Sequence, residues 1–130
     1  MRNWKNKEFT CVNDWFSSEH NAEIGLYGQT LINDFTPIEI RPDIGHLWEN
    51  FIISERIKRN HYHRAHLISF FWRTYTGAEL DYVEQGMGKL SGHEIKWGKK
   101  IVKAPKSWIE NYPEADSGII NPGNFQDFVI

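Results

Sequence analysis

The chain has 130 residues, a length typical of one domain that leaves little for a second. Its formal net charge of −2 provides no general positive field for nucleic acid, so any such contact would need a local basic patch. The single cysteine, Cys11, excludes an intramolecular disulfide and a cysteine-based zinc cluster. We find no signal-peptide pattern and no apolar run of bilayer length, so we expect a cytoplasmic protein without a membrane partner.

The N-terminal part of the chain gives weak structural signals. Residues 1–20 are polar with scattered aromatic side chains and no steady period, so we interpret them as an arm that is loosely ordered or foreign to the rest. We assign residues 21–130 to one α/β domain, in which Tyr27–Asn33 is expected to be a short helix or turn. Asp43–Asn60 is the clearest helix, because its apolar side chains recur at helical spacing.

Three strands are predicted after this helix. Short apolar or aromatic-rich runs indicate strands at Leu67–Trp72, Glu79–Glu84 and Leu90–Trp97. Gly86 and Gly88 indicate a tight hairpin turn, which makes the second and third strands adjacent and antiparallel.

The remaining sequence predicts one more helix and one more strand. We expect a basic loop at Gly98–Lys103 and, after Pro105, a short helix at Lys106–Tyr112. A last strand at Ser117–Ile120 and a tail at Phe125–Ile130 follow. The order of elements predicts an α/β fold, namely a mixed sheet that contains an antiparallel meander and is flanked by helices.

Strand alternation places three charged residues close together. Glu94 and Lys96 share one face of their strand, whereas Ile95 and Trp97 point to the other face. The hairpin brings Asp81 across from Glu94 and Lys96, so the three side chains can meet if the register is right.

Such a trio suits phosphodiester chemistry. Asp81 and Glu94 would bind Mg²⁺ or Mn²⁺, which polarises a phosphoryl oxygen and lowers the pKa of a bound water. Lys96 would orient that water or stabilise the charge that develops in the transition state. Glu49, on the flank of the apolar stripe of the preceding helix, would complete the metal shell.

Four motifs carry a resemblance to a known family. They are DIGHLWENF at 43–51, FWRT at 71–74, GAELDYV at 77–83 and EIKW at 94–97. In this order they resemble the PD-(D/E)XK, or restriction-endonuclease-like, nuclease superfamily, and within it the domain at the C-terminus of many prokaryotic AAA+ type ATPases. The resemblance covers roughly residues 31–130. It implies the nuclease-like fold and a site at Glu49, Asp81, Glu94 and Lys96.

The chain departs from those ATPases in one respect that bears on cofactors. It has no GxxxxGK[ST] loop, so we expect no ATP binding by that route. We therefore expect a separated or truncated fragment without the ATPase part, for which an ATPase domain, a second copy of the chain and nucleic acid are the candidate partners.

Simpler interpretations stay open for each group. Taken alone, Asp81 would be interpreted as a solvated charge on an exposed strand face. Glu94 and Lys96 would be interpreted as an ordinary ion pair on one face of the sheet. The histidines of the polar connection, His61, His63 and His66, are best explained as solvated, and the aromatic side chains of Phe70, Phe71, Trp72 and Trp97 as core. The basic group of Lys96, Lys99, Lys100, Lys103 and Lys106 could contact phosphates, and a solvated loop explains Lys99 to Lys106 equally well.

Two hypotheses follow from the sequence. In the first, the chain is a metal-dependent phosphodiesterase domain that cleaves DNA or RNA through Asp81, Glu94 and Lys96. In the second, it is a catalytically silent nuclease-like module that mediates assembly or nucleic-acid contact for an ATPase.

Overall fold

The computed structural model describes residues 8–12 and 42–130. The predicted turn or helix at Tyr27–Asn33, and most of the expected N-terminal arm, lie outside the described residues. The elements in chain order are β1 (Phe9–Cys11), α3 (Ile44–Tyr62), β2 (Ile68–Arg73), β3 (Glu79–Gly86), β4 (Lys89–Ile95), α4 (Lys106–Asn111), β5 (Asp116–Ile120) and α5 (Phe125–Val129).

The five strands form one mixed sheet in the order β1-β2-β3-β4-β5. Each pair from β1 to β4 is antiparallel, and β5 pairs in parallel with β4 after the chain has crossed through α4. The α/β class and the antiparallel meander predicted from the sequence are confirmed. No described helix has both the length and the apolar character that a bilayer crossing requires.

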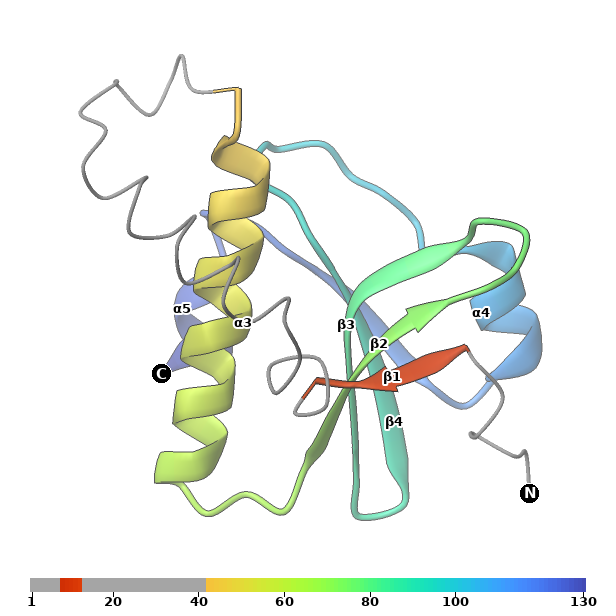
Figure 1. The fold of residues 1–130 in the computed structure, drawn as a ribbon, viewed down its shortest axis with the longest axis horizontal. Helices are drawn as coiled ribbons and strands as arrows, with labels where there is room; N and C mark the ends of the chain where they lie inside the picture. The colour runs from red at the N-terminus through yellow and green to blue at the C-terminus, as the bar shows by residue number, and fades with distance from the viewer. Residues whose placement is uncertain (1–7, 13–41) are drawn as a thin grey trace.

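Helices cover both faces of the sheet (Figure 1). The face toward α3 and α5 packs a core around Ile52, Tyr82 and Phe128. The face toward α4 packs a second core around Trp72 and Trp108. Burial of these large apolar side chains supplies the main stabilisation of a domain of this size.

Two short elements were not predicted from the sequence. The strand β1, within the expected arm, pairs with the outer edge of β2, and Phe9 packs edge-to-face on Phe70. The last residues, expected to be a tail, form the helix α5. Both elements are too short to show a period, and they are held by packing: Phe128 of α5 is buried against Tyr82.

One irregularity in the sheet affects the region of interest. Phe70 pairs with Val83 and Trp72 pairs with Leu80, so two positions along β2 match three along β3. Leu80 and Val83 both belong to the α4-side core, although regular alternation over three positions would place them on opposite faces. The strand β3 therefore contains a β-bulge, in which Asp81 and Tyr82 together face Phe71 of β2.

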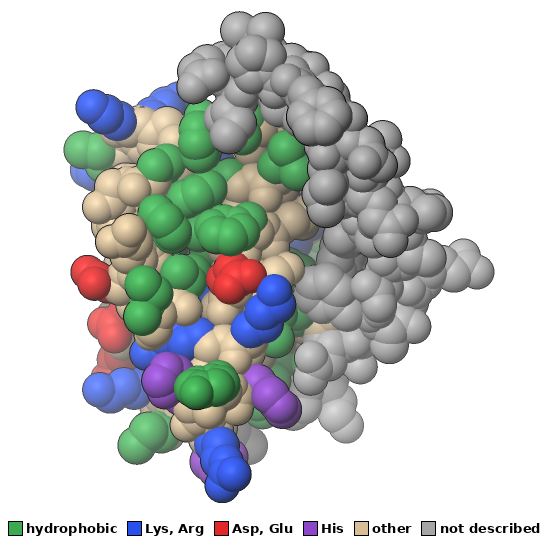
Figure 2. All heavy atoms as spheres, turned by 90° about the vertical axis from the view of Figure 1, so that its left-hand side faces the viewer, with side chains coloured by type: hydrophobic (Ala, Val, Ile, Leu, Met, Phe, Trp, Pro, Cys, Tyr) green, Lys and Arg blue, Asp and Glu red, His purple; other side chains and the backbone are tan. Residues whose placement is uncertain are grey.

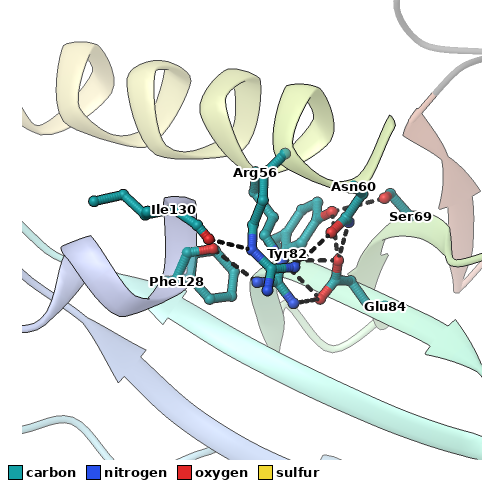
Figure 3. Close-up of polar contacts among 8 residues, drawn as sticks. Arg56, Asn60, Ser69, Tyr82, Glu84, Phe128 and Ile130 are labelled. Carbon is teal, nitrogen blue, oxygen red and sulfur yellow. Dashed lines mark hydrogen bonds and ion pairs between the residues drawn. The ribbon is translucent and has the colours of Figure 1, made fainter. Parts of the chain in front are cut away.

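A buried ionic network joins α3, β3 and α5 (Figure 3). Arg56 of α3 donates from Nη2 to Oε1 of Glu84 at 2.7 Å, and its Nε contacts both carboxylate oxygens at 3.1 Å. Asn60 and the hydroxyl of Tyr82 donate to Oε2 of the same carboxylate. Arg56 also donates to the Phe128 carbonyl at 2.7 Å, and its guanidinium lies 4.3 Å from the Phe128 ring centre.

The network decides the charge state of Glu84. Burial alone would raise the pKa of this carboxyl, but the hydrogen bonds and the positive charge of Arg56, with the hydrogen bond from Asn60, together hold the pKa below its usual range. Glu84 is therefore ionised, and its contribution to stability is lost as the pH falls through this lowered pKa.

We predict that Arg56→Ala strongly destabilises the fold. The substitution leaves the Glu84 carboxylate buried without its cation, which typically costs about 3–5 kcal/mol. Urea denaturation monitored by circular dichroism measures the loss. Lys58→Ala is the matched control on the same helix, because the Lys58 side chain is 71% exposed, and its pair with Glu55 is expected to contribute under about 1 kcal/mol. Equal losses in the two variants would contradict a structural role for the buried pair.

Candidate metal and phosphodiester site

The candidate site lies where β3 and β4 stop pairing. The last paired residues of the two strands are Tyr82 and His93, so Asp81 and Glu94 come directly after the end of the ladder. The carboxylate of Asp81 turns toward the neighbouring strand, where its Oδ2 accepts a hydrogen bond from the Ile95 amide at 2.7 Å. This bond fixes the Asp81 side chain against β4 at the opening.

The strand β4 ends at Ile95, two residues before the predicted end at Trp97, so Lys96 directly follows the strand, with its side chain next to that of Glu94. The Nζ of Lys96 is 3.5 Å from Oε2 of Glu94. Ile95 lies on the other side in the α3-side core, and Trp97 packs edge-to-face against Trp48 of α3. Glu94 is buried, whereas the Lys96 side chain is 42% exposed, so the ammonium is accessible to a substrate.

The site opens to both faces of the sheet. On the α3 side, Glu49 and Asp81 line a cavity of about 380 Å³ together with His46, Arg73 and Glu79. On the α4 side, Glu94 lines a second cavity of about 390 Å³ together with Lys103 and Ile109. Alternation suggested one common face for the site. The bulge instead directs the Asp81 carboxylate toward the α3 side of the sheet, while this carboxylate stays beside Glu94.

The electrostatics show that these carboxyl groups are close enough to interact. Burial, and then the negative charge of Asp81, raise the pKa of Glu49 to about 7, and Lys96 offsets part of this rise. Burial raises the pKa of Glu94 to about 7 as well, with the charge of Asp81 and a hydrogen bond to it as the next causes. The structure thus brings together the four residues selected from the sequence: Glu49, Asp81, Glu94 and Lys96.

The carboxylates of Asp81 and Glu94 are the candidate ligands for a divalent cation. Within the described residues, no three side chains of His, Cys, Asp or Glu are grouped closely enough to hold an ion by themselves. Mg²⁺ commonly uses only one or two carboxylates and keeps several waters. The negative charge of Asp81 raises the pKa of Glu94, so the two carboxyl groups are close enough to repel one another as anions, and a cation between them would offset that repulsion.

Of the histidines in the described part of the chain, His46 lines the α3-side cavity of the candidate site. His61, His63 and His66 are exposed to solvent as expected, although His61 belongs to the last turn of α3 and not to a loop. His93 lies on the other face from Glu94, against the Phe128 ring at 4.8 Å, and burial lowers its pKa to about 4. His46 lines the α3-side cavity one helical turn before Glu49, a placement that the helical spacing would have revealed.

Residues 44–128 match the family described as Domain of unknown function (DUF4143), and the chain belongs to that family. Comparisons with curated proteins and with solved structures gave no match. The matched segment contains all four residues of the candidate site.

We predict that Glu49→Gln changes the pH dependence of stability. Because the pKa of Glu49 is about 7 in the folded chain and its ordinary value is 4.5, the folded state retains a proton that the unfolded chain releases. The resulting stabilisation is present below about pH 4.5 and is lost as the pH rises through about 7. Position 49 of the variant does not titrate. The free energy of unfolding of the variant, relative to that of the wild type, should therefore increase from about pH 5 to about pH 8.

Urea denaturation at these two pH values measures the effect. Glu55→Gln, on the same helix, is the matched control for the removal of a glutamate charge. A relative stability of Glu49→Gln that stays constant with pH, or a trend of equal size in the control, would show that Glu49 is not held protonated by the site.

Proposed function

We propose that this member of the DUF4143 family is a nuclease-like domain that hydrolyses phosphodiester bonds in nucleic acid with a divalent cation, Mg²⁺ or Mn²⁺. The observation that supports the proposal most directly is the meeting of Asp81 and Glu94 beside Lys96 at the open end of the β3–β4 ladder. The pKa of a helix glutamate, Glu49, is raised by its burial and by the negative charges of the same carboxylates. This composition agrees with the resemblance to the PD-(D/E)XK superfamily.

Each residue has a distinct role in the proposed reaction. When bound, the cation polarises a phosphoryl oxygen and lowers the pKa of a water. Asp81 and Glu94 would hold it, and Glu49 would support it from the α3 side. The exposed ammonium of Lys96 would position the attacking water and stabilise negative charge on the phosphoryl oxygens.

The context of the domain is part of the proposal. We infer a cytoplasmic protein that works with an AAA+ type ATPase domain or with a second copy of itself, since the sequence resembles the C-terminal domain of such ATPases. Nucleotide hydrolysis would belong to that partner, because this chain lacks the phosphate-binding glycine-rich loop.

A catalytically silent module is the second candidate. The observation in its favour is the protonation of the site: with pKa values of about 7, Glu49 and Glu94 are partly neutral near physiological pH. Lys96 also lies against Glu94, so the group is partly neutralised from within. Such a site would act in assembly or in nucleic-acid contact without cleavage.

We predict that Asp81→Asn and Lys96→Ala each reduce metal-dependent cleavage by at least about 100-fold, because each removes a group that acts on the reacting phosphate. The assay uses labelled single- and double-stranded DNA and RNA with Mg²⁺, Mn²⁺ or EDTA. Glu114→Gln is the control for the removal of a carboxylate, since Glu114 is exposed between α4 and β5, lines neither cavity and should leave cleavage intact.

Metal binding separates the two candidates from a purely structural site. We expect Mn²⁺ to raise the melting temperature of the wild type but not of Asp81→Asn. A metal-dependent thermal shift without cleavage of any substrate would favour the silent module. Wild-type protein that neither binds Mn²⁺ nor cleaves would exclude the phosphodiesterase proposal.

A further inference from the structure

Positive charge is concentrated in one segment next to the candidate site. Residues 95–109 contain five lysines and no acidic residue, although the whole chain has a net charge of −2. Lys99, Lys100 and Lys103 are exposed, and none of them pairs with an acidic group in the described part of the chain. Spaced lysines of this kind attract phosphates rather than neutral ligands.

Aromatic side chains form a cluster on the α3 and α5 side of this segment. Trp48 is buried at its centre, and the rings of Trp97, Phe125 and Phe51 lie 5.3, 5.2 and 5.8 Å from it. Trp97 is 37% exposed and Phe51 is 45% exposed, so both rings reach solvent. Figure 2 shows hydrophobic side chains gathered in the upper half of this face, with basic side chains at its upper left margin.

The basic segment and the aromatic cluster are continuous with the site. Trp97 directly follows Lys96 in the chain, and the basic loop begins after it. At the far end of the loop, Lys103 lines the same cavity as Glu94. A ligand that follows the loop from Trp97 to Lys103 would therefore lead from the exposed aromatic rings on the α3 side to the Glu94 cavity on the α4 side.

We propose that this surface binds single-stranded nucleic acid, with bases stacked on Trp97 and Phe51 and phosphates along Lys99, Lys100 and Lys103. The proposal rests on the proposed function and names its substrate class. Base faces are available for stacking on aromatic rings only when they are not stacked in a duplex. A protein partner fits less well, because the centres of protein interfaces are depleted in lysine.

The test measures binding separately from cleavage. Fluorescence anisotropy of a labelled 20-nucleotide single strand and of its matched duplex is recorded with the full chain in EDTA, so that no metal-dependent hydrolysis occurs. We expect the single strand to bind at least about 10-fold more tightly than the duplex. Trp97→Ala and Phe51→Ala should each weaken single-strand binding by roughly 5- to 150-fold, as expected for loss of one stacked base.

The chain offers a matched control for each type of change. Tyr75→Ala removes a ring that is 85% exposed in the turn between β2 and β3, away from the proposed surface, and should leave binding unchanged. Lys100→Glu should weaken binding and lower its salt dependence, whereas Lys89→Glu on the β3–β4 hairpin should not. Circular dichroism confirms that each variant is folded, and Phe51→Ala serves as the second test if Trp97→Ala is not.

The outcomes separate this inference from the proposed function. Single-strand binding that depends on Trp97 and Lys100, without cleavage when Mg²⁺ is added, would support the surface and contradict the phosphodiesterase. Cleavage of duplex DNA together with equal or tighter duplex binding would support the enzyme and overturn the surface. Self-association that Phe51→Ala abolishes, without any binding of the single strand, would assign the aromatic cluster to a second copy and overturn the inference.

Discussion

The buried pair of Arg56 and Glu84 sets the geometry on which the candidate site depends. Arg56 follows Glu49 by seven positions on α3, and Glu84 follows Asp81 by three positions on β3. Seven helical residues rise about 10.5 Å, and three strand residues rise about 10 Å. Once Arg56 is bonded to Glu84, the helix and the strand are in a register that also places Glu49 beside Asp81.

The same pair connects the C-terminal helix to this frame. Arg56 donates to the Phe128 carbonyl and lies over the Phe128 ring, while Arg59 donates to the Ile130 carbonyl at 2.9 Å. One ionised carboxylate therefore organises a long helix, the central strand and a helix of five residues. Hydrogen bonds to the whole carboxylate offset its desolvation, which is the condition under which a buried charge is tolerated.

Much of the fold could be predicted because its central elements are long or strongly patterned. The apolar stripe of α3 and the alternation around the β3–β4 hairpin gave the meander and the neighbourhood of Glu94 and Lys96. The strand β1 and the helix α5 show no period in so few residues, and their formation depends on tertiary contacts of Phe9 and Phe128. The buried position of Arg56 could not be predicted, because nothing in the sequence distinguishes a buried arginine from a solvated one.

The site itself was predictable in its members but not in its layout. Spacing selected Asp81, Glu94 and Lys96, and Lys96 does lie next to Glu94, although β4 ends at Ile95 and not at Trp97. No glycine or proline marks the bulge in the run from Leu80 to Val83, so a regular strand was the natural expectation there. The raised pKa values of Glu49 and Glu94 also depend on three-dimensional burial, which spacing does not report.

The bulge has a consequence for how such a domain gains or loses its chemistry during evolution. Asp81 and Tyr82 together face Phe71 across the β2–β3 ladder, so the pairing would be regular if Asp81 were absent. Removing a single codon there would preserve the order of every other strand residue and would delete the carboxylate that links Glu49 to Glu94. Relatives with an intact fold but an inert centre could therefore differ in the length of β3 by one residue, a change that a comparison of residue types alone would overlook.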